Sequence, residues 1–134
     1  MDRLSKEKRS WNMRRIPSSN TKPEIKVRRQ LHALGYRFRL HRADLPGKPD
    51  IVLPKHRLAI LVHGCFWHRH RGCKYAYSPK TRTEFWKNKF NSNVQRDQLV
   101  IQELERLGWN TAIVWECETR NADSFQELLL GFLP

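Results

Sequence analysis

Residues 49–63 have the sequence PDIVLPKHRLAILVH, in which two apolar runs flank a short basic turn. Residues 51–53 and 58–62 are long enough to form strands, and the proline and basic residues between them predict a tight reversal of the chain. An unbroken apolar run such as the second is typical of a strand that is buried on both faces of a sheet. This stretch therefore predicts an antiparallel hairpin at the centre of the fold.

The segments on either side of the hairpin predict a mixed sheet covered by helices. Before it, residues 21–35 have helical periodicity and residues 36–40 alternate as a strand. After it, residues 83–107 predict a long helix, with a candidate break at residues 91–93, and residues 111–115 predict a second buried strand. A last short helix carries Phe125, Leu128, Leu129 and Phe132. Because a strand reached through a long helix adds parallel to its neighbour, we expect a three-layer α/β/α domain with a central mixed sheet.

The charge of the chain indicates a polyanionic partner. Its 134 residues include 26 lysines and arginines against 13 acidic residues, which gives a net charge of +13. This excess favours nucleic acid, because neutralising phosphates releases their counterions. The sequence shows neither the basic amphipathic helix of a membrane-surface protein nor the apolar run of a transmembrane helix or secretory signal. We therefore expect a cytoplasmic protein that binds nucleic acid.

The predicted domain spans residues 21–134, and residues 1–20 form a basic arm before it. The arm is polar, includes Arg14 and Arg15, and ends in the loop signal Pro-Ser-Ser-Asn of residues 17–20. Its positive charge suits it to clamp phosphates, although a run of charge is equally typical of a solvated tail.

The hairpin brings an acid and a histidine to the same end of the sheet. If the turn is centred between His56 and Arg57, Asp50 lies opposite His63 in the antiparallel pair. The Asp50 carboxylate and the main-chain carbonyl of Val62 are hard oxygen donors of the kind that Mg²⁺ prefers. A magnesium ion there would polarise a phosphate and activate water, so this strand end is the predicted catalytic site. By itself, an aspartate here would also suit an ordinary proline-rich turn.

Two more side chains extend this site. His68 lies in the loop after the second strand and is a candidate general base toward the attacking water. Glu24 is a candidate to orient His68. Glu24 also fits the capping box that begins at Thr21, and the sequence leaves both roles open.

A cysteine-rich loop follows the catalytic candidates. Cys65, His70 and Cys73 lie within nine residues, and Cys117 follows the last predicted strand. An odd number of cysteines in a cytosolic chain argues against disulfides, whereas a Cys₃His set makes a closed tetrahedral zinc site. We expect a structural Zn²⁺ that pins this loop, with His68 as the alternative to His70. Three buried thiols without a metal are the other interpretation.

Aromatic and basic residues around the loop suit contact with DNA. Phe66 and Trp67 lie inside the loop, and Trp86 opens the long helix. Large aromatic residues on a basic surface can wedge between base steps, although packing in the core is the simpler role, above all for Trp86. The basic residues expected to line a phosphate groove are Arg69, Arg71, Lys74, Lys80 and Arg82.

Several blocks of the sequence closely resemble the very short patch repair (Vsr) DNA mismatch endonucleases. In order along the chain, the blocks are LPGKPD at 45–50, VHGCFWH at 62–68, TRTEFW at 81–86, NVQRD at 93–97 and VWEC at 114–117. Several spaced blocks that agree in order are a more specific signal than any one of them. The resemblance implies a restriction-endonuclease-like fold. It also implies an enzyme that starts very short patch repair by nicking DNA on the 5′ side of the thymine in a thymine–guanine mismatch, such as forms when 5-methylcytosine deaminates.

The resemblance further implies roles for individual residues. Asp50 would bind a catalytic Mg²⁺ with the Val62 carbonyl, and His63, His68 and Glu24 would assist the attacking water. The ligands of a structural Zn²⁺ would be Cys65, His70, Cys73 and Cys117. The residues expected to insert into DNA or to hold it are Phe66, Trp67, Trp86, Arg14, Arg15, Lys48, Arg82 and Asn93. A monomer in the bacterial cytoplasm, associated with the nucleoid, and a functional link to a cytosine-5 DNA methyltransferase are further expectations.

Two other functions fit parts of the sequence. One is a zinc-stabilised DNA-binding module without chemistry, and the other is a nuclease of the same fold with a different DNA target. The clustering of Asp50, His63 and His68 at one strand end favours an enzyme, because binding alone needs no carboxylate facing phosphates. The aromatic wedge favours a mismatch over a perfect duplex as the target.

Overall fold

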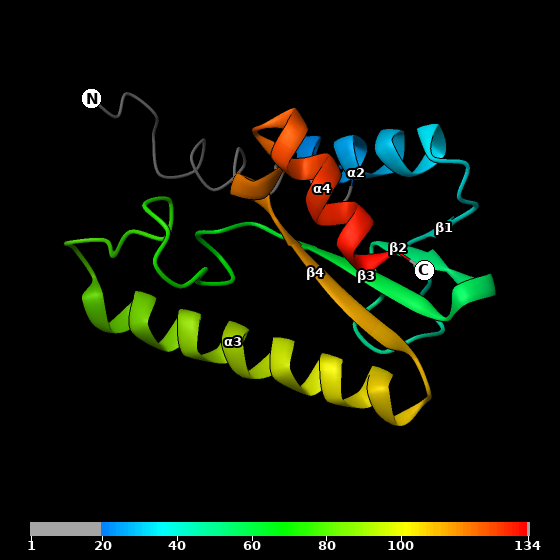
Figure 1. The fold of residues 1–134 in the computed structure, drawn as a ribbon. Coiled ribbons are helices and arrows are strands. Elements are labelled where there is room, and N and C mark those ends of the chain that lie inside the picture. Colours follow the sequence, from blue (N-terminus) through cyan, green and yellow to red (C-terminus); the bar gives the residue numbers. More distant parts are fainter. Residues whose placement is uncertain (1–19, 134) are drawn as a thin grey trace.

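The computed structural model describes residues 20–133, which form three helices and four strands (Figure 1). In chain order the elements are α2 (Lys22–Ala33), β1 (Arg39–Leu40), β2 (Ile51–Leu53), β3 (Leu58–His63), α3 (Thr83–Arg106), β4 (Asn110–Trp115) and α4 (Ala122–Phe132), with short 3-10 turns η1 (Pro54–His56) and η2 (Glu116–Thr119). Of the predicted basic arm, only Asn20 is among the described residues, so the DNA contacts predicted for Arg14 and Arg15 lie outside them.

The four strands form one sheet in the order β1-β2-β3-β4. The β1–β2 and β2–β3 pairs are antiparallel, whereas β3 and β4, which are connected through α3, are parallel. Helices α2 and α4 cover one face of the sheet and α3 crosses the other face (Figure 1). This arrangement confirms the predicted three-layer α/β/α domain with a mixed sheet. No helix among residues 20–133 is long and apolar enough to cross a membrane.

Each face of the sheet has its own apolar core. On one face, Val27 and Leu31 of α2 pack with Phe125 and Leu129 of α4 against the strands. On the other face, Leu104 of α3 packs against the sheet. Full burial of a side chain of this size contributes roughly 1.5–3 kcal/mol, so the central strands are held firmly from both sides.

Two predicted elements differ from those observed. Of the strand predicted over residues 36–40, only Arg39 and Leu40 pair with β2, while Tyr36 and Phe38 pack against the core. Helix α3 continues without interruption through residues 91–93, where the sequence offered a break. Its apolar positions continue on one face beyond these residues, and packing of that face stabilises the helix more than local propensity weakens it.

The hairpin register differs from the predicted one. Continuation of the observed β2–β3 ladder puts Asp50 opposite Leu61 and not opposite His63. The turn is centred one residue earlier than expected, because residues 54–56 form a 3-10 turn that Arg57 closes in a left-handed conformation with a φ of 49°. Asp50 directly precedes β2 and its carboxylate is grouped with Glu24 of α2, whereas His63 is grouped with Asp97 of α3.

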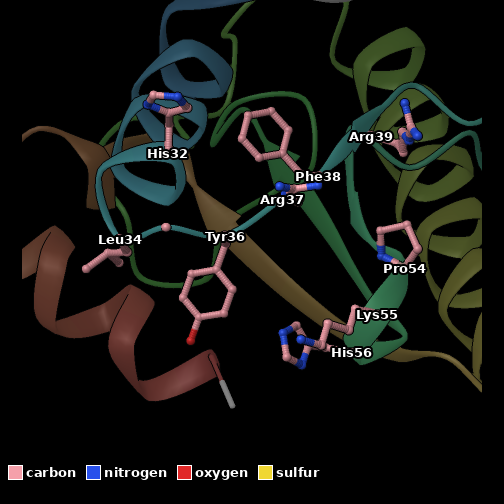
Figure 2. A pocket seen from close by; sticks show the side chains of 10 residues that line it. His32, Leu34, Tyr36, Arg37, Phe38, Arg39, Pro54, Lys55 and His56 are labelled. Carbon is pink, nitrogen blue, oxygen red and sulfur yellow. The ribbon is translucent and has the colours of Figure 1, made fainter.

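A hollow lies at the turn end of the hairpin, between the end of α2 and η1 (Figure 2). Its lining includes Tyr36, Phe38, Arg39 and residues 54–56. Asp50 and His63 lie at the other end of β2 and β3. The hollow is therefore separate from the predicted catalytic site.

Candidate active site and metal centre

A tight turn that packs on α3 delivers Asp50 to the sheet. Gly47 has a φ of 71°, and a Cβ atom there would lie 2.4 Å from Cγ1 of Val100, so the position requires glycine. Lys48 is also left-handed, with a φ of 47°, and its N–H donates to the Leu45 carbonyl at 3.1 Å. The chain therefore reverses against α3 before β2 begins, and it leaves Lys48 exposed.

The Asp50 carboxylate contacts the main chain of β3. Its Oδ2 accepts a hydrogen bond from the Val62 N–H at 2.8 Å. The β2–β3 register continues with Pro49 opposite Val62, and proline has no N–H to donate to the Val62 carbonyl. Since the N–H and C=O of one strand residue point to the same side, this carbonyl is turned toward β2 and Asp50. Pro49 thus leaves a carbonyl oxygen for a ligand beside a carboxylate.

Glu24 and His41 are the neighbours of Asp50. Glu24 is buried on α2, and its Oε2 lies 2.8 Å from the main-chain N of Asn20, 3.0 Å from Arg28 and 3.1 Å from Nε2 of His41. Burial, together with the negative charge of Glu24, raises the pKa of Asp50 to about 6, although the main-chain N–H that Asp50 accepts lowers it. Two carboxylates in a buried place favour a proton or a cation beside them.

Glu24 takes part in the N-terminal cap of α2 as well as in the group around Asp50. Thr21 is the N-cap, and its Oγ1 accepts from the Glu24 N–H at 3.4 Å. In return the Glu24 carboxylate accepts from the N–H of Asn20, one residue before the position that a capping box predicts. Of the two roles that the sequence left open, the structure therefore supports the helix cap, while the Glu24 carboxylate contacts His41 and not His68.

A second cluster joins His63, at the end of β3, to His68 in the loop and Asp97 on α3. The two imidazole rings stack with their centroids 3.9 Å apart and their planes 8° apart. Nδ1 of His68 lies 2.6 Å from Oδ2 of Asp97. Asp97 thus has the place in which Glu24 was expected, because α3 and α2 lie on opposite faces of the sheet. A carboxylate that accepts from Nδ1–H leaves Nε2 as the basic atom of the His68 ring.

His63 is a buried histidine with an unsatisfied ring nitrogen. It is 6% exposed, and its Nδ1 has no hydrogen-bond partner among residues 20–133. Burial, with the neighbouring His68 ring, lowers the pKa of His63 to about 4, so the ring is neutral at pH 7. A buried polar atom costs free energy unless it meets water, an ion or a substrate, and this atom fits a site that binds one of them.

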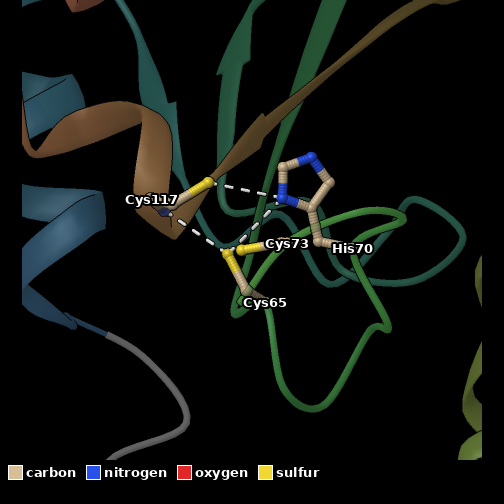
Figure 3. A group of neighbouring side chains, drawn as sticks. All are labelled: Cys65, His70, Cys73 and Cys117. Carbon is tan, nitrogen blue, oxygen red and sulfur yellow. Dashed lines mark hydrogen bonds between the residues drawn. The ribbon is translucent and has the colours of Figure 1, made fainter. Parts of the chain in front are cut away.

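Four metal-ligating side chains, Cys65, His70, Cys73 and Cys117, converge in a separate group (Figure 3). Their ligand atoms all lie within 4.8 Å of one another, with His70 Nδ1 3.7 Å from Cys65 Sγ and 3.3 Å from Cys117 Sγ. Tetrahedral zinc holds nitrogen and sulfur ligands about 3.6 Å apart, so the donor set and its spacing fit Zn²⁺. His70 is the histidine of this group, whereas His68 belongs to the cluster with Asp97.

The parallel β3–β4 pair explains why the distant Cys117 joins this group. His63 pairs with Trp115, so each strand ends at the same level and the chain leaves the sheet two residues before a cysteine. The Cys117 N–H then donates to Cys65 Sγ at 3.4 Å. The parallel pairing of β3 and β4 therefore brings Cys117 to the other three residues of the group.

Trp115 connects the cysteine group to the catalytic candidates. Its ring stacks on His70 with the centroids 4.3 Å apart, and it meets His63 edge-on at 5.3 Å. A disturbance of the cysteine group would therefore reach His63 through a single aromatic ring.

The three predicted wedge residues form one aromatic cluster at the surface. The Phe66 ring lies 5.1 Å from Trp67 and 5.5 Å from Trp86, between centroids, and Trp86 packs on Phe90 of α3. Trp67 is 37% exposed, whereas Phe66 and Trp86 are half-buried. Trp67 is thus the most accessible of the three, and it directly precedes His68 in the loop.

Arg69 stabilises the loop from within. Its guanidinium donates to the carbonyls of Phe66 at 3.3 Å, Ala76 at 2.9 Å and Tyr77 at 3.0 Å, and it lies 3.9 Å from the centre of the Phe90 ring. These contacts hold both terminal nitrogens of the guanidinium inside the loop. The role of Arg69 in a phosphate groove stays a prediction.

Other residues predicted to hold DNA surround the aromatic cluster. The Asn93 side chain donates to the Trp67 carbonyl at 3.2 Å and so fixes the backbone there. Arg82, at the start of α3, lies over the Phe85 ring at 4.3 Å. Both residues hold the aromatic surface in place, and Arg82 remains exposed.

Sequence reasoning did not select His41 or Asp97 as site residues. Asp97 continues a stripe on α3 that contains Trp86, Phe90 and Asn93 at spacings of three or four, so a polar residue on this stripe was a usable signal. His41 gave no such signal, because only the pairing of β1 with β2 returns it to Asp50.

Comparisons with known proteins identify the family of the chain. The family described as DNA mismatch endonuclease Vsr matches residues 1–74. The type II nicking enzyme V.XorIIP of Xanthomonas oryzae pv. oryzae is 48% identical over 132 residues, which cover 98% of this chain and 96% of that protein. DNA mismatch endonuclease Vsr of Escherichia coli is 43% identical over 122 residues, 91% of this chain and 78% of that protein. The type II nicking enzyme V.NmeAIP of Neisseria meningitidis is 41% identical over 128 residues, 96% of this chain and 91% of that protein. The chain therefore belongs to the Vsr family of DNA mismatch endonucleases.

Proposed function

We propose that this endonuclease nicks duplex DNA on the 5′ side of the thymine in a thymine–guanine mismatch, by magnesium-dependent hydrolysis of one phosphodiester bond. The observation that carries the proposal is the meeting, at one end of the sheet, of the Asp50–Val62 contact and the stacked His63–His68 pair. Hydrolysis of a phosphodiester requires oxygen ligands for a metal and a base for the water at one place. A DNA-binding module without chemistry requires neither.

The Asp50 carboxylate and the Val62 carbonyl fit a magnesium ion. Both are hard oxygen donors. Pro49, which lies opposite Val62, has no N–H to donate to the Val62 carbonyl, so that oxygen is available to a ligand. When bound, Mg²⁺ stabilises charge on the phosphate and lowers the pKa of its water. Because the pKa of Asp50 is raised to about 6, binding below that pH displaces a proton from the carboxyl group.

His68 is the proposed general base. Asp97 holds Nδ1, which leaves Nε2 to accept the proton of the attacking water, and the carboxylate then stabilises the imidazolium that forms. His63 stays neutral and stacks on His68, so it restrains that ring without adding charge. The unpartnered Nδ1 of His63 is proposed to bind water or a phosphate oxygen.

The Cys₃His group is the proposed structural zinc site. Cys65, His70, Cys73 and Cys117 supply four protein ligands, which leaves no open position for substrate. Zinc there would hold the loop that carries His68 and Trp67.

The aromatic cluster is the proposed reader of the mismatch. Unstacking costs less at a mispaired base than at a paired one, so a residue that wedges into the stack prefers the mismatch. Trp67 is proposed to insert, supported by Phe66 and Trp86, which pack against it. Lys48 and Arg82 are proposed to bind phosphates around it.

A second candidate function is the same nicking reaction on a different DNA target. The names of two relatives favour it, because V.XorIIP and V.NmeAIP are called type II nicking enzymes and not mismatch endonucleases. Nicking assays on duplexes that vary the mismatch and its neighbouring pairs, with and without Mg²⁺, distinguish the two. Faster nicking of a thymine–guanine duplex than of all others supports the first proposal. Equal nicking of mismatched and perfect duplexes would favour the second.

Asp97→Asn is expected to lower kcat by about 10²–10⁴-fold with little change in KM for DNA, because general-base catalysis contributes that range. Asparagine can accept from Nδ1–H but does not stabilise the imidazolium. Steady-state nicking kinetics measure the effect. The control is Asp44→Asn, an exposed acid paired with Arg42. A variant at Asp97 with the wild-type kcat would show that His68 is not the base or needs no carboxylate.

Trp67→Ala is expected to remove about 1–3 kcal/mol of the binding preference for a thymine–guanine duplex, the usual value of one base–aromatic stacking contact. Binding to a perfect duplex should change less, because it depends mainly on phosphate contacts. Competition binding with the two duplexes measures the preference. Leu99→Ala, an exposed apolar residue on α3 outside the aromatic cluster, is the control. Equal losses on both duplexes would rule out a wedge.

A further inference from the structure

His41 lies at the catalytic strand end but has no role in the proposed mechanism. It directly follows β1, in a left-handed conformation with a φ of 47°. Its N–H donates to the Asp50 carbonyl at 3.1 Å, which fixes its backbone beside the catalytic acid. Residues other than glycine seldom adopt this conformation, and such residues concentrate at sites where a side chain must be aimed. Here the conformation aims the imidazole at Glu24.

The ligand atoms of Glu24, His41 and Asp50 have the spacing of a metal site. All three atoms lie within 4.8 Å of one another, and Nε2 of His41 is 3.1 Å from Oε2 of Glu24. Neighbouring ligands of an octahedral ion with bonds near 2.1 Å are about 3 Å apart. In the structure Nε2 and Oε2 contact each other directly, and a metal ion between them would replace this contact.

The charge balance of the group also favours a cation. Two carboxylates lie in one group, of which Glu24 is buried and Asp50 is half-buried. Arg28, the Asn20 N–H and Nε2 of His41 all contact Oε2 of Glu24, so a metal shared with His41 would replace the His41 contact or bind the other carboxylate oxygen. The Val62 carbonyl adds a neutral oxygen at the same strand end. One nitrogen and three oxygens make a mixed donor set, which transition metals bind better than Mg²⁺ does.

We propose that His41 is a nitrogen ligand of the divalent metal ion at Asp50, with Glu24 as a further ligand, and that the site therefore binds Mn²⁺ in preference to Mg²⁺. This inference rests on the proposed function, which places the catalytic ion at Asp50.

The test is pulsed electron paramagnetic resonance of Mn²⁺ added to the zinc-loaded chain. The wild-type spectrum should contain a nitrogen coupling from one imidazole. His41→Gln, which keeps an N–H to donate to Glu24, should remove this coupling. Titration calorimetry should show that His41→Gln also weakens Mn²⁺ binding by at least roughly tenfold, because loss of a residue that only supports a ligand already costs about that much. The same variant should weaken Mg²⁺ binding less. His32→Gln, an exposed histidine on the same helix as Glu24, is the matched control and should behave as wild type.

Three outcomes would overturn the inference: a wild-type spectrum without nitrogen coupling, a coupling that survives in His41→Gln, or a coupling lost only in His68→Gln. Asp50→Ala separates this from failure of the proposed function. If that variant still binds Mn²⁺ and nicks DNA, the ion is not at Asp50 and both proposals fail. If it binds no ion and is inactive while the wild type shows no nitrogen coupling, only the role of His41 is lost.

Discussion

Replacing Asp50 with alanine is expected to lower the single-turnover nicking rate by at least about 10³-fold, because a metal ion supplies several kcal/mol of stabilisation to a phosphoryl transition state. Asp50→Asn should have the same effect. Asparagine keeps an oxygen that can accept from the Val62 N–H, so the hairpin end stays in place while the charge is lost. The measurement is the rate on a thymine–guanine duplex as Mg²⁺ is titrated.

Asp44→Ala is the matched control for both variants, because it removes an exposed acid from the loop that leads to Asp50. It should nick at the wild-type rate. Thermal melting of all three proteins separates a chemical defect from unfolding. If nicking survives in a folded Asp50→Ala chain, Asp50 is not a ligand of the catalytic ion.

Cys73→Ser is expected to reduce bound zinc from about one ion per chain to almost none, because a four-ligand zinc site that loses one thiolate ligand loses most of its affinity for the ion. Cys73 is preferable to Cys65, which is fully buried and also packs in the core. The loop from 64 to 82 would lose its anchor, and nicking would fall with it because His68 and Trp67 lie there. A loss of a few kcal/mol corresponds to a fall in Tm of roughly 10 °C or more for a domain of this size.

Metal analysis, melting and nicking of the same preparation check this result. Lys80→Ala, an exposed position in the same loop, is the control and should keep its zinc. A wild-type chain purified without zinc that nicks DNA normally would contradict the structural-zinc proposal.

The sequence predicts the strands well and the hairpin register poorly, for a physical reason. Apolar runs mark β2 and β3 because those strands are buried. The turn depends on Arg57, whose guanidinium donates to the carbonyls of Leu107 and Gly108 at the far end of α3. A contact across 50 residues leaves no local pattern, so the position of the turn was not predictable from residues 54–57 alone.

The side chains that Glu24 and Asp97 contact were also not predictable from the sequence. Glu24 was assigned to His68 because both belong to the predicted site, but a linear pattern does not show which face of the sheet each helix covers. The structure gives His68 to Asp97 and Glu24 to His41. The cysteine group was easier, since three of its members are close in sequence and the parallel-strand rule places the fourth.

The separation between the cysteines also sets an order of events while the ribosome makes the protein. Cys117 follows Cys65 by 52 residues, and it reaches the loop only after the final strand has added to the sheet. Contacts between distant segments form late, and chains emerge from their amino-terminal end. A chain that ends before Cys117 therefore has only three of the four proposed zinc ligands, so the loop that carries His68 would gain its proposed anchor last.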